Sequence, residues 1–468
     1  MGDGGTRTEK DSMGSVEVPK DAWYGASTAR AAENFPISSR RFGRSMIRAL
    51  GLLKAAAAEV NRELGVLDVE RAEAIAAAAH EVARGDHDDQ FVVDVFQTGS
   101  GTSTNMNANE VIANLAAVRL GGSRGDRDRV HPNDHVNYGQ SSNDIIPTAL
   151  QFAACMDIDA VLRPGLSALH AALENKAEAF RNEIKTGRTH LQDATPIRLG
   201  QVFHGYAGQI ERGLARVARA EEELAEVALG GTAVGTGLNT HAEFASRVCA
   251  LASKAAGVEI RETSNHFQAQ ATLDSVVAAS GALRTVAVSL HKIANDIRWL
   301  ASGPRCGLGE LSLPAVQPGS SIMPGKVNPV IAESMIQAAA QVVANDLTIV
   351  QSGLGSVFEL NTMLPVAASN LHESIGLLGR TAANFAERCV RGLTATGRGA
   401  ELVEQGLSTV TGLVPAIGYD RSAAIAKQAA ASGKTVREVA REEGIDEATL
   451  TEGLDPFKMT RPEGAKED

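Results

Sequence analysis

The sequence predicts a mainly α-helical protein whose centre is a bundle of long helices. Aromatic residues make up only 4% of its 468 residues, whereas hydrophobic residues of all kinds make up 44%. A core of small and aliphatic side chains, rich in alanine and leucine, suits close helix packing better than the packing of a β-sandwich. Apolar residues also recur at helical spacing through stretches longer than an ordinary globular helix.

The N-terminal part is expected to consist of helices joined by polar, glycine-rich loops. Arg48–Leu64 carries apolar residues at helical spacing, and Val69–Val82 is rich in alanine. The segment His131–Asn143 is instead rich in proline, asparagine, aspartate and serine, which is typical of a loop. We therefore predict a helical domain over residues 1–139.

Four longer helical patterns follow, at residues 144–179, 199–229, 274–300 and 330–351. In the third, Ile293, Ile297 and Leu300 fall on one helical face. Long helices that lack a strict heptad pattern indicate a bundle whose core can be shared between subunits. We predict a central long-helix bundle domain at 140–397 and a small C-terminal helical domain at 398–468.

Charge and cysteine content disfavour several classes of function. The formal net charge of -11 disfavours a nucleic-acid partner. The four cysteines are scattered and form no CxxC pair, so a zinc knuckle, an iron–sulfur cluster and a disulfide framework are not expected. Met1–Lys10 lacks the apolar core of a signal peptide, and no uninterrupted apolar run of about 18 residues occurs. We expect a cytoplasmic protein without a membrane partner, a metal or a cofactor.

The clearest chemical signal lies in residues 317–329, a loop dense in glycine, proline and serine that ends at the start of a long helix. Its spacing excludes a phosphate-binding P-loop, because five residues separate Gly319 from Gly325 and valine follows Lys326. A surface loop with a helix-capping serine is the simpler alternative. Backbone N–H groups at a helix N-terminus, together with the charge of Lys326, favour an anion such as a carboxylate.

Three further segments share the order and residue types of one known family. They are Thr98–Asn107, His131–Asp134 continuing to Ser141–Asp144, and Gly187–Asp193. Together with Gly319–Pro329, they resemble the signature segments of the fumarase/aspartase superfamily. The resemblance extends from about Met13 to the C-terminal module and therefore covers nearly the whole chain.

The resemblance implies a three-domain lyase fold in which the long-helix bundle forms the core of a homotetramer. The reaction it implies is the reversible anti addition of water to fumarate, which gives L-malate through an aci-carboxylate intermediate. No metal or other cofactor is implied. Each active site would take its loops from three chains of the tetramer.

The same resemblance assigns roles to individual residues. Ser320 would be the base, and Lys326 would stabilise the carboxylate whose charge grows. His190 would position or activate the water, and Glu333 would pair with this histidine and raise its basicity. The further substrate contacts it implies are Ser100, Gly101, Thr102, Ser141, Ser142, Asn143, Thr189, Ser321, Lys326, Val327 and Asn328. A secondary dicarboxylate site is implied at His131, Pro132, Asn133 and Asp134.

Two alternatives stay open. An aspartate ammonia-lyase usually carries alanine where Gly325 stands and glutamine where His190 stands, so both positions follow the fumarase pattern. Trp23-Tyr24-Gly25, outside the catalytic segments, is slightly more similar to aspartases. A non-catalytic relative is the other alternative, and the presence of the implied base, lysine, histidine and glutamate argues against it.

Overall fold

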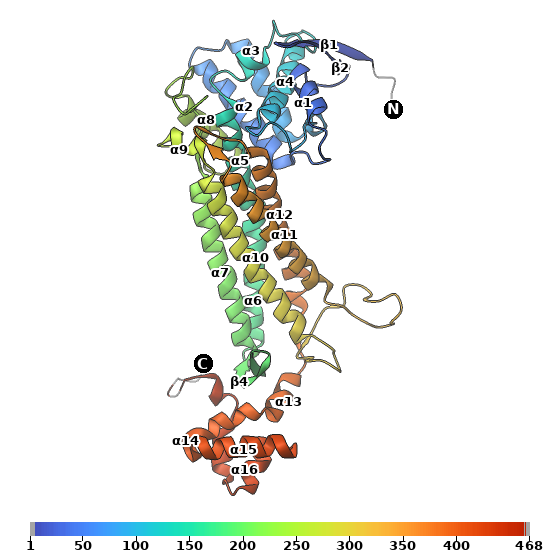
Figure 1. Cartoon of the computed structure of the whole chain (residues 1–468), viewed down its shortest axis with the longest axis vertical. Helices are drawn as coiled ribbons and strands as arrows, with labels where there is room; N and C mark the ends of the chain where they lie inside the picture. The colour runs from blue at the N-terminus through green and yellow to red at the C-terminus, as the bar shows by residue number, and fades with distance from the viewer. Residues whose placement is uncertain (1–4, 463, 465–468) are drawn as a thin grey trace. The chain divides into compact units, whose positions relative to one another are not determined.

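The computed structural model describes residues 5–462 and 464 of the chain. Helices dominate it, and the longest are α7, α10, α11 and α12 (Figure 1). The prediction of a mainly α-helical protein is therefore confirmed. Every sheet within the described residues has two strands, so the core is made by helices.

The chain divides into two compact units that alternate along the sequence. Unit 1 comprises Met1–Pro164, Ala215–Ala287 and Ala339–Arg380, and unit 2 comprises Gly165–Leu214, Val288–Ala338 and Thr381–Asp468. The five boundaries fall inside α6 (Arg163–Ala179), α7 (Leu199–Leu224), α10 (Asp274–Leu300), α11 (Val330–Gly353) and α12 (Leu364–Arg388). A division by compactness does not test a division by sequence ranges, so the three domains stay a prediction.

Unit 1 contains the N-terminal helices and most of the short strands. Besides its parts of the long helices, its elements are β1 (Thr6–Asp11), β2 (Gly14–Pro19), α1 (Ala26–Asn34), α2 (Arg44–Glu63), α3 (Val69–Arg84), η1 (Asp88–Gln90), α4 (Thr102–Arg119), η2 (Pro132–Val136), α5 (Ser142–Asp157), η3 (Ile158–Leu162), β5 (Glu226–Val227), α8 (Phe244–Ala256), β6 (Arg261–Glu262), α9 (His266–Ala271), β8 (Ser356–Val357) and β9 (Leu360–Asn361). Strands β1 and β2 pair antiparallel, as do β8 and β9, whereas β5 and β6 pair parallel.

The centre of unit 1 is built around α2, which packs against α3, α5 and α8. Its contact with α3 is close, because a Cβ on Gly51 would lie only 2.6 Å from the backbone nitrogen of Ala83. Glycine and alanine therefore allow the two helix backbones to approach each other. One of the largest fully buried side chains in this region is charged, namely Lys54 of α2.

Helix α5 continues through the π turn η3 into α6 (Arg163–Ala179) without a break. The predicted long helix over 144–179 is thus confirmed, with one irregularity. Pro164 explains it, because proline lacks the N–H that would bond the carbonyl of residue 160 and its ring displaces that carbonyl. A π turn at this point accommodates the missing bond.

Polar contacts show how the long helices pack within each unit. In unit 1, Ser280 and Arg284 of α10 donate to the buried carboxylate of Asp346 on α11. In unit 2, the Tyr206 hydroxyl of α7 donates to Asp296 on α10 at 3.0 Å. Burial, together with the negative charge of Asp296, raises the pKa of the Tyr206 hydroxyl above its usual value. The long helices therefore pack as neighbours within each unit, as a bundle requires.

Two helical stretches, Ser142–Ala179 and α10, are long and apolar enough to cross a membrane by length and composition alone. In the first stretch, 78% of the apolar window is buried inside the protein, as in a core helix. Length and composition do not distinguish a core helix from a membrane span. The expected absence of a membrane partner therefore stays a prediction.

Unit 2 joins a β-hairpin and an extended loop to the C-terminal helices. Besides its parts of the long helices, its elements are β3 (Ile184–Thr189), β4 (Gln192–Arg198), β7 (Leu311–Ser312), η4 (Val390–Gly392), β10 (Thr394–Ala395), α13 (Arg398–Gln405), η5 (Leu407–Leu413), α14 (Val414–Ile417), α15 (Tyr419–Ser432), α16 (Val436–Glu442), α17 (Glu447–Gly453) and η6 (Lys458–Thr460). β3 and β4 pair antiparallel, and so do β7 and β10. The C-terminal helices share an apolar cluster that includes Leu413, Val439 and Leu450.

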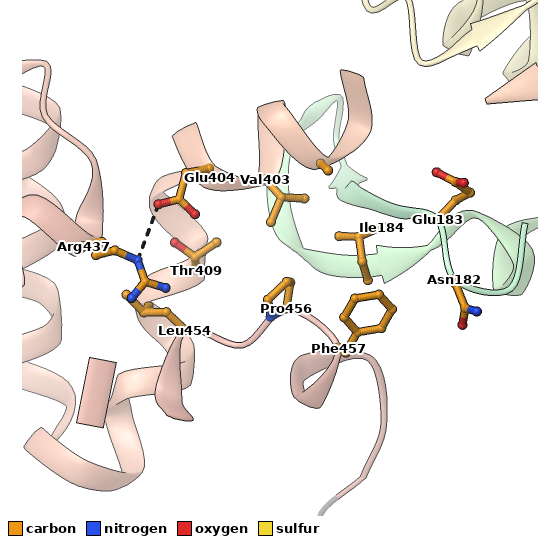
Figure 2. Close-up of a pocket in the computed structure, with 11 residues that line it drawn as sticks. Asn182, Glu183, Ile184, Val403, Glu404, Thr409, Arg437, Leu454, Pro456 and Phe457 are labelled. Carbon is orange, nitrogen blue, oxygen red and sulfur yellow. Dashed lines mark ion pairs between the residues drawn. The ribbon is translucent and has the colours of Figure 1, made fainter. Parts of the chain in front are cut away.

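A cavity of about 200 Å³ lies in unit 2, between strand β3 and the C-terminal helices (Figure 2). Ile184 and Phe457 supply apolar surface, and Arg437 pairs with Glu404 at 3.6 Å (Figure 2). None of the residues predicted for the active site lines this cavity. It is therefore separate from the candidate site.

Candidate active site

The residues predicted for the active site fall into two groups, one in each compact unit. Unit 1 carries Ser100–Thr102, His131–Asp134 and Ser141–Asn143. Unit 2 carries Thr189–His190, the loop Gly319–Asn328 and Glu333.

In unit 1 the two predicted carboxylate-binding segments meet through their hydroxyl groups. Thr102 Oγ1 lies 2.7 Å from Ser100 Oγ and 2.8 Å from Ser142 Oγ. Thr102 begins α4 and Ser142 begins α5, so two helix N-termini adjoin this row of hydroxyls. Unpaired N–H groups at helix N-termini, together with hydroxyl donors, suit a carboxylate.

Gly101 shows how closely the two segments that carry these hydroxyls pack together. Its φ is 73°, in the left-handed region that favours glycine, and it precedes the first residue of α4. A Cβ at this position would lie 2.7 Å from Cγ2 of Ile146. Both the backbone conformation and the lack of space therefore require glycine here.

Asp144, which the sequence analysis did not single out as functional, fixes the start of α5. Its carboxylate accepts N–H bonds from Ser141, Gly230 and Thr232 at 2.9, 3.1 and 2.9 Å. Burial raises the pKa of Asp144 to about 6, while these N–H donors act to lower it. A capping box, in which serine is followed three residues later by an acid, is the signal that could have identified Asp144.

Asn143 also contributes to holding this segment. Its side-chain Nδ2 donates to the carbonyl of Ala233 at 2.9 Å, which ties the segment to the chain beyond β5. The buried side chain of Gln270 donates to the carbonyls of Thr232 and Ala233 from the other side. Within this chain the amide nitrogen of Asn143 is therefore engaged in positioning the segment.

The predicted secondary site is a short π turn capped by its own histidine. His131 Nδ1 accepts N–H bonds from Asn133 and Asp134, both at 3.1 Å. Pro132 is buried, whereas Asn133 and Asp134 are exposed and border a cavity of about 750 Å³. The other residues lining that cavity are Asn61, Val66, Asn137, Tyr138, Gly139, Gln140, Asn239, Thr240 and His241. The polar lining suits a small hydrophilic ligand.

In unit 2 the hydroxyl oxygen of Ser320 faces two backbone donors. Ser320 Oγ accepts N–H bonds from Ile322 at 3.2 Å and from Met323 at 3.0 Å. Two N–H groups directed at one oxygen favour the charged form of the serine over the neutral hydroxyl. Ser320 is half-buried, so its oxygen stays within reach of a small molecule.

The ends of this loop are bonded to each other. Gly319 N donates to the carbonyl of Lys326 at 2.8 Å, and Asn328 Nδ2 donates to the carbonyl of Gly319 at 2.5 Å. The amide nitrogen of Asn328, predicted to contact substrate, is thus used to close the loop. Ser321, Lys326 and Val327 are exposed, and the Lys326 ammonium has no ion-pair partner within residues 5–462.

His190 lies at the tip of the hairpin formed by β3 and β4. The residues paired on either side of the tip are Thr189 and Gln192, so His190 and Leu191 form a two-residue turn. Both have positive φ, 57° and 60°, as in the type I′ turns that normally contain asparagine or glycine. Residues held in this region are strained, and such strain clusters at functional sites.

The base of this hairpin is held by a buried ion pair that the sequence analysis missed. Arg188 makes two bonds of 3.0 Å to the carboxylate of Glu310, which is 3% exposed. Lys185 lies 3.8 Å from the same carboxylate, and burial lowers the pKa of Lys185 despite the nearby charge of Glu310. Glu310 precedes the Ser320 loop, so the pair connects that segment to the strand carrying His190. Arg188 stood inside a recognised segment, but nothing local in the sequence marked Glu310.

Glu333 lies in the first turn of α11. Within residues 5–462 of this single chain, no hydrogen bond or ion pair joins Glu333 to His190. The pairing of these two residues stays a prediction. The described residues also contain no group of three or more His, Cys, Asp or Glu side chains placed to hold a metal ion. The expectation that the reaction needs no metal stays a prediction as well.

Comparison with known proteins identifies the family. Residues 14–344 match the family model described as Lyase, and residues 410–461 match the model of the Fumarase C C-terminus. The chain is 56% identical over 456 residues to the class II fumarate hydratase of Halobacterium salinarum, a match that covers 97% of each chain. This chain belongs to the class II fumarate hydratase family. It is also 54% identical over 441 residues to the Mycobacterium tuberculosis member, covering 94% of this chain and 92% of that one.

The solved structure of a family member confirms the fold. The class II fumarase of Schistosoma mansoni superimposes with a TM-score of 0.95 at 38% identity, covering 98% of this chain and 100% of that chain. The predicted fumarase/aspartase-like fold is therefore confirmed, and this chain is a lyase of the fumarate hydratase family.

Proposed function

We propose that this chain catalyses the reversible anti addition of water to fumarate, which gives L-malate. The observation that carries the proposal is the Ser320 oxygen, held between two backbone N–H donors in the loop that enters α11. A serine activated in this way can take a proton from a carbon atom, which an ordinary serine cannot. The class II fumarate hydratases that the chain resembles are named for this reaction.

In the direction from malate to fumarate, Ser320 takes the proton from the carbon next to one carboxylate. The electron pair of the broken C–H bond moves into that carboxylate, which becomes an aci-carboxylate. The ammonium of Lys326, four residues before the start of α11 at Val330, stabilises the added charge. The hydroxide then leaves the neighbouring carbon, and His190 positions the water or supplies its proton. The carbon–carbon double bond of fumarate results.

The hydroxyl row of Ser100, Thr102 and Ser142 is proposed to bind a substrate carboxylate, beside the N-termini of α4 and α5. Small donors on rigid helix starts suit a compact dianion better than a bulky apolar ligand. We also propose that the active site works without a metal or another cofactor, and that the protein is cytoplasmic. The secondary dicarboxylate site at His131–Asp134 belongs to the same proposal.

A homotetramer with active sites shared by three chains is part of the proposal. Ile322, Met323 and Val327 of the Ser320 loop are 83%, 47% and 45% exposed in the single chain. Apolar side chains gathered in this way on one loop are typical of a surface that another chain covers. An active site that excludes water needs such a cover over the base.

Gly325 favours fumarate hydration over the deamination of aspartate. Its φ of 80° lies in the left-handed region, where the alanine usual in aspartases would be strained. The deciding measurement is the ultraviolet absorbance of fumarate during incubation of the purified chain with L-malate and a chelator. We expect fumarate to accumulate from malate and not from L-aspartate. Consumption of aspartate without consumption of malate would contradict the proposal.

A further inference from the structure

We propose that Lys54 is a positioning residue for the two carboxylate-binding segments of unit 1. It acts by orienting the side-chain amides of Asn137 and Gln140, which shape the turn that leads into Ser141–Asn143. The inference rests on the proposed function of those segments and adds a residue to the site that no motif identified.

Lys54 is unusual because its side chain is completely buried. A lysine is almost never buried unless its amine is paired. Here Nζ donates to Asn137 Oδ1 at 2.9 Å and to Gln140 Oε1 at 2.8 Å. No carboxylate lies within ion-pair distance of Nζ in residues 5–462. Burial accordingly lowers the pKa of Lys54 to about 7, although the charge of Asp144 acts in the opposite direction.

These two bonds fix which way each amide faces. An amine N–H can bond only the oxygen of an amide, so both oxygens must point toward Lys54. The nitrogen of Asn137 must then point the other way, where it donates to the carbonyl of Gln140 at 3.1 Å. The nitrogen of Gln140 likewise donates to the carbonyls of Val136 and Tyr138, both at 3.2 Å.

The oriented amides close a turn directly before the binding segment. Gln140 N donates to the carbonyl of Asn137 at 3.1 Å, so this turn is held by its backbone and by both side chains. The next residue is Ser141, the N-cap of α5. The direction in which the chain enters α5 therefore depends on the turn that Lys54 holds.

The same lysine reaches the other binding segment through Asn137. Asn105 Nδ2 donates to Asn137 Oδ1 at 3.1 Å, and Asn105 lies in the first turn of α4, three residues after Thr102. The hydroxyls of Thr102 and Ser142 join the two segments on one side, and Lys54, Asn137 and Asn105 join them on another. A methionine would fill the space of Lys54 in a dry core without the cost of burying an amine. Retaining the amine is understandable if it sets the spacing between the two helix starts.

The test is the variant Lys54→Met in the full chain, assayed for malate turnover. We expect KM for malate to rise about tenfold while kcat changes less than about threefold. Misplaced carboxylate-binding segments weaken the binding of ground state and transition state alike. The matched control is Gln151→Met, farther along α5. It removes two hydrogen bonds that the buried side chain of Gln151 donates to the backbone carbonyls of Leu224 and Glu226. Its KM should stay within about twofold of that of the unmodified chain.

A fall in thermal stability with an unchanged KM in Lys54→Met would overturn the inference, and so would an equal rise of KM in the control. If Lys54→Met does not fold, the half-buried Asn137 provides the second variant. Asn137→Ala should raise KM in the same direction, and an unchanged KM there would also overturn it. Where both variants fold, their combination should raise KM no more than the larger single change. Turnover by the unmodified chain tests the proposed function separately.

Discussion

The carboxylate-binding residues of unit 1 and the residues proposed to act on the substrate in unit 2 are held in different ways. In unit 1, Ser100 is buried and Thr102 and Ser142 are half-buried, and their hydroxyls bond to one another. In unit 2, Lys326 and His190 are exposed, and neither makes a side-chain hydrogen bond within residues 5–462. The half-buried Ser320 oxygen is held by two N–H groups of its own loop. The hydroxyls of unit 1 are thus ordered by one another, whereas Lys326 and His190 lie exposed and Ser320 is held by its loop alone.

This difference indicates which kinetic parameter depends on the residues of each unit. Groups that hold a substrate carboxylate gain from being fixed before binding, because less order is then lost on association. Groups that exchange protons need to be shielded from bulk solvent only while the reaction proceeds. Exposed turns can be covered when subunits or substrate assemble, so we expect losses in kcat from unit 2 and losses in affinity from unit 1.

The largest effect is expected for Ser320→Ala. It removes the oxygen to which Ile322 and Met323 direct their N–H groups, which is the proposed acceptor of the carbon-bound proton. We expect kcat for malate to fall by about 10⁴-fold, the upper range for a positioned acid–base group. KM should change little, because the carboxylate-binding groups stay in place.

The neighbouring serine provides the control for that variant. Ser321 is exposed and makes no side-chain hydrogen bond within residues 5–462. Ser321→Ala should lose less than about tenfold in kcat/KM, as expected for one hydrogen bond to substrate. If Ser320→Ala keeps most of its activity, the serine is not the base.

A smaller loss is expected for His190→Asn. Asparagine tolerates the left-handed conformation of this turn, so the hairpin should keep its shape while the imidazole is lost. We expect kcat to fall by about 10²-fold, because solvent water can replace part of the role of the histidine. Gln192→Ala, at the exposed position that follows the turn, should stay within about threefold of the unmodified chain.

Mixing the Ser320→Ala and His190→Asn variants sharpens the comparison. If an active site takes Ser320 and His190 from different chains, tetramers assembled from Ser320→Ala and His190→Asn chains contain some sites with both groups intact. After the two variants are unfolded and refolded together, activity should then rise above that of either variant refolded alone. If mixed tetramers form but are no more active than the variants refolded alone, both residues of a site come from one chain, and the shared site is contradicted.

Much of this arrangement could be predicted from the sequence, because the signals were local. Helical spacing identified the long helices, including the one over residues 144–179. The family resemblance placed Thr102 and Ser142 among the substrate contacts, but their meeting within one chain left no local signal, since the two lie 40 residues apart. Asp144 carried a capping signal that a closer analysis of the helix start would have used.

Other features left no local signal. His190 and Leu191 are poor residues for a turn with two positive φ values, so turn propensities argue against the conformation they adopt. The pairing of Arg188 with Glu310 spans 122 residues and depends on the path of the chain through unit 2. The burial of Lys54 also left no signal, because a single lysine in an alanine-rich helix is usually exposed.

The smallest effect is expected in unit 1, for Ser142→Ala. The change removes one hydroxyl from the row that includes Thr102, and the helix starts that frame the site stay in place. We expect KM for malate to rise about tenfold, equivalent to about 1.4 kcal/mol, with kcat within about threefold. Thr148→Val is the control, because it removes a buried hydroxyl that bonds only the carbonyl of Asp144 within the same helix. If Ser142→Ala lost as much kcat as His190→Asn, the hydroxyls of unit 1 would not be distinguished from the residues of unit 2 by a role in binding alone.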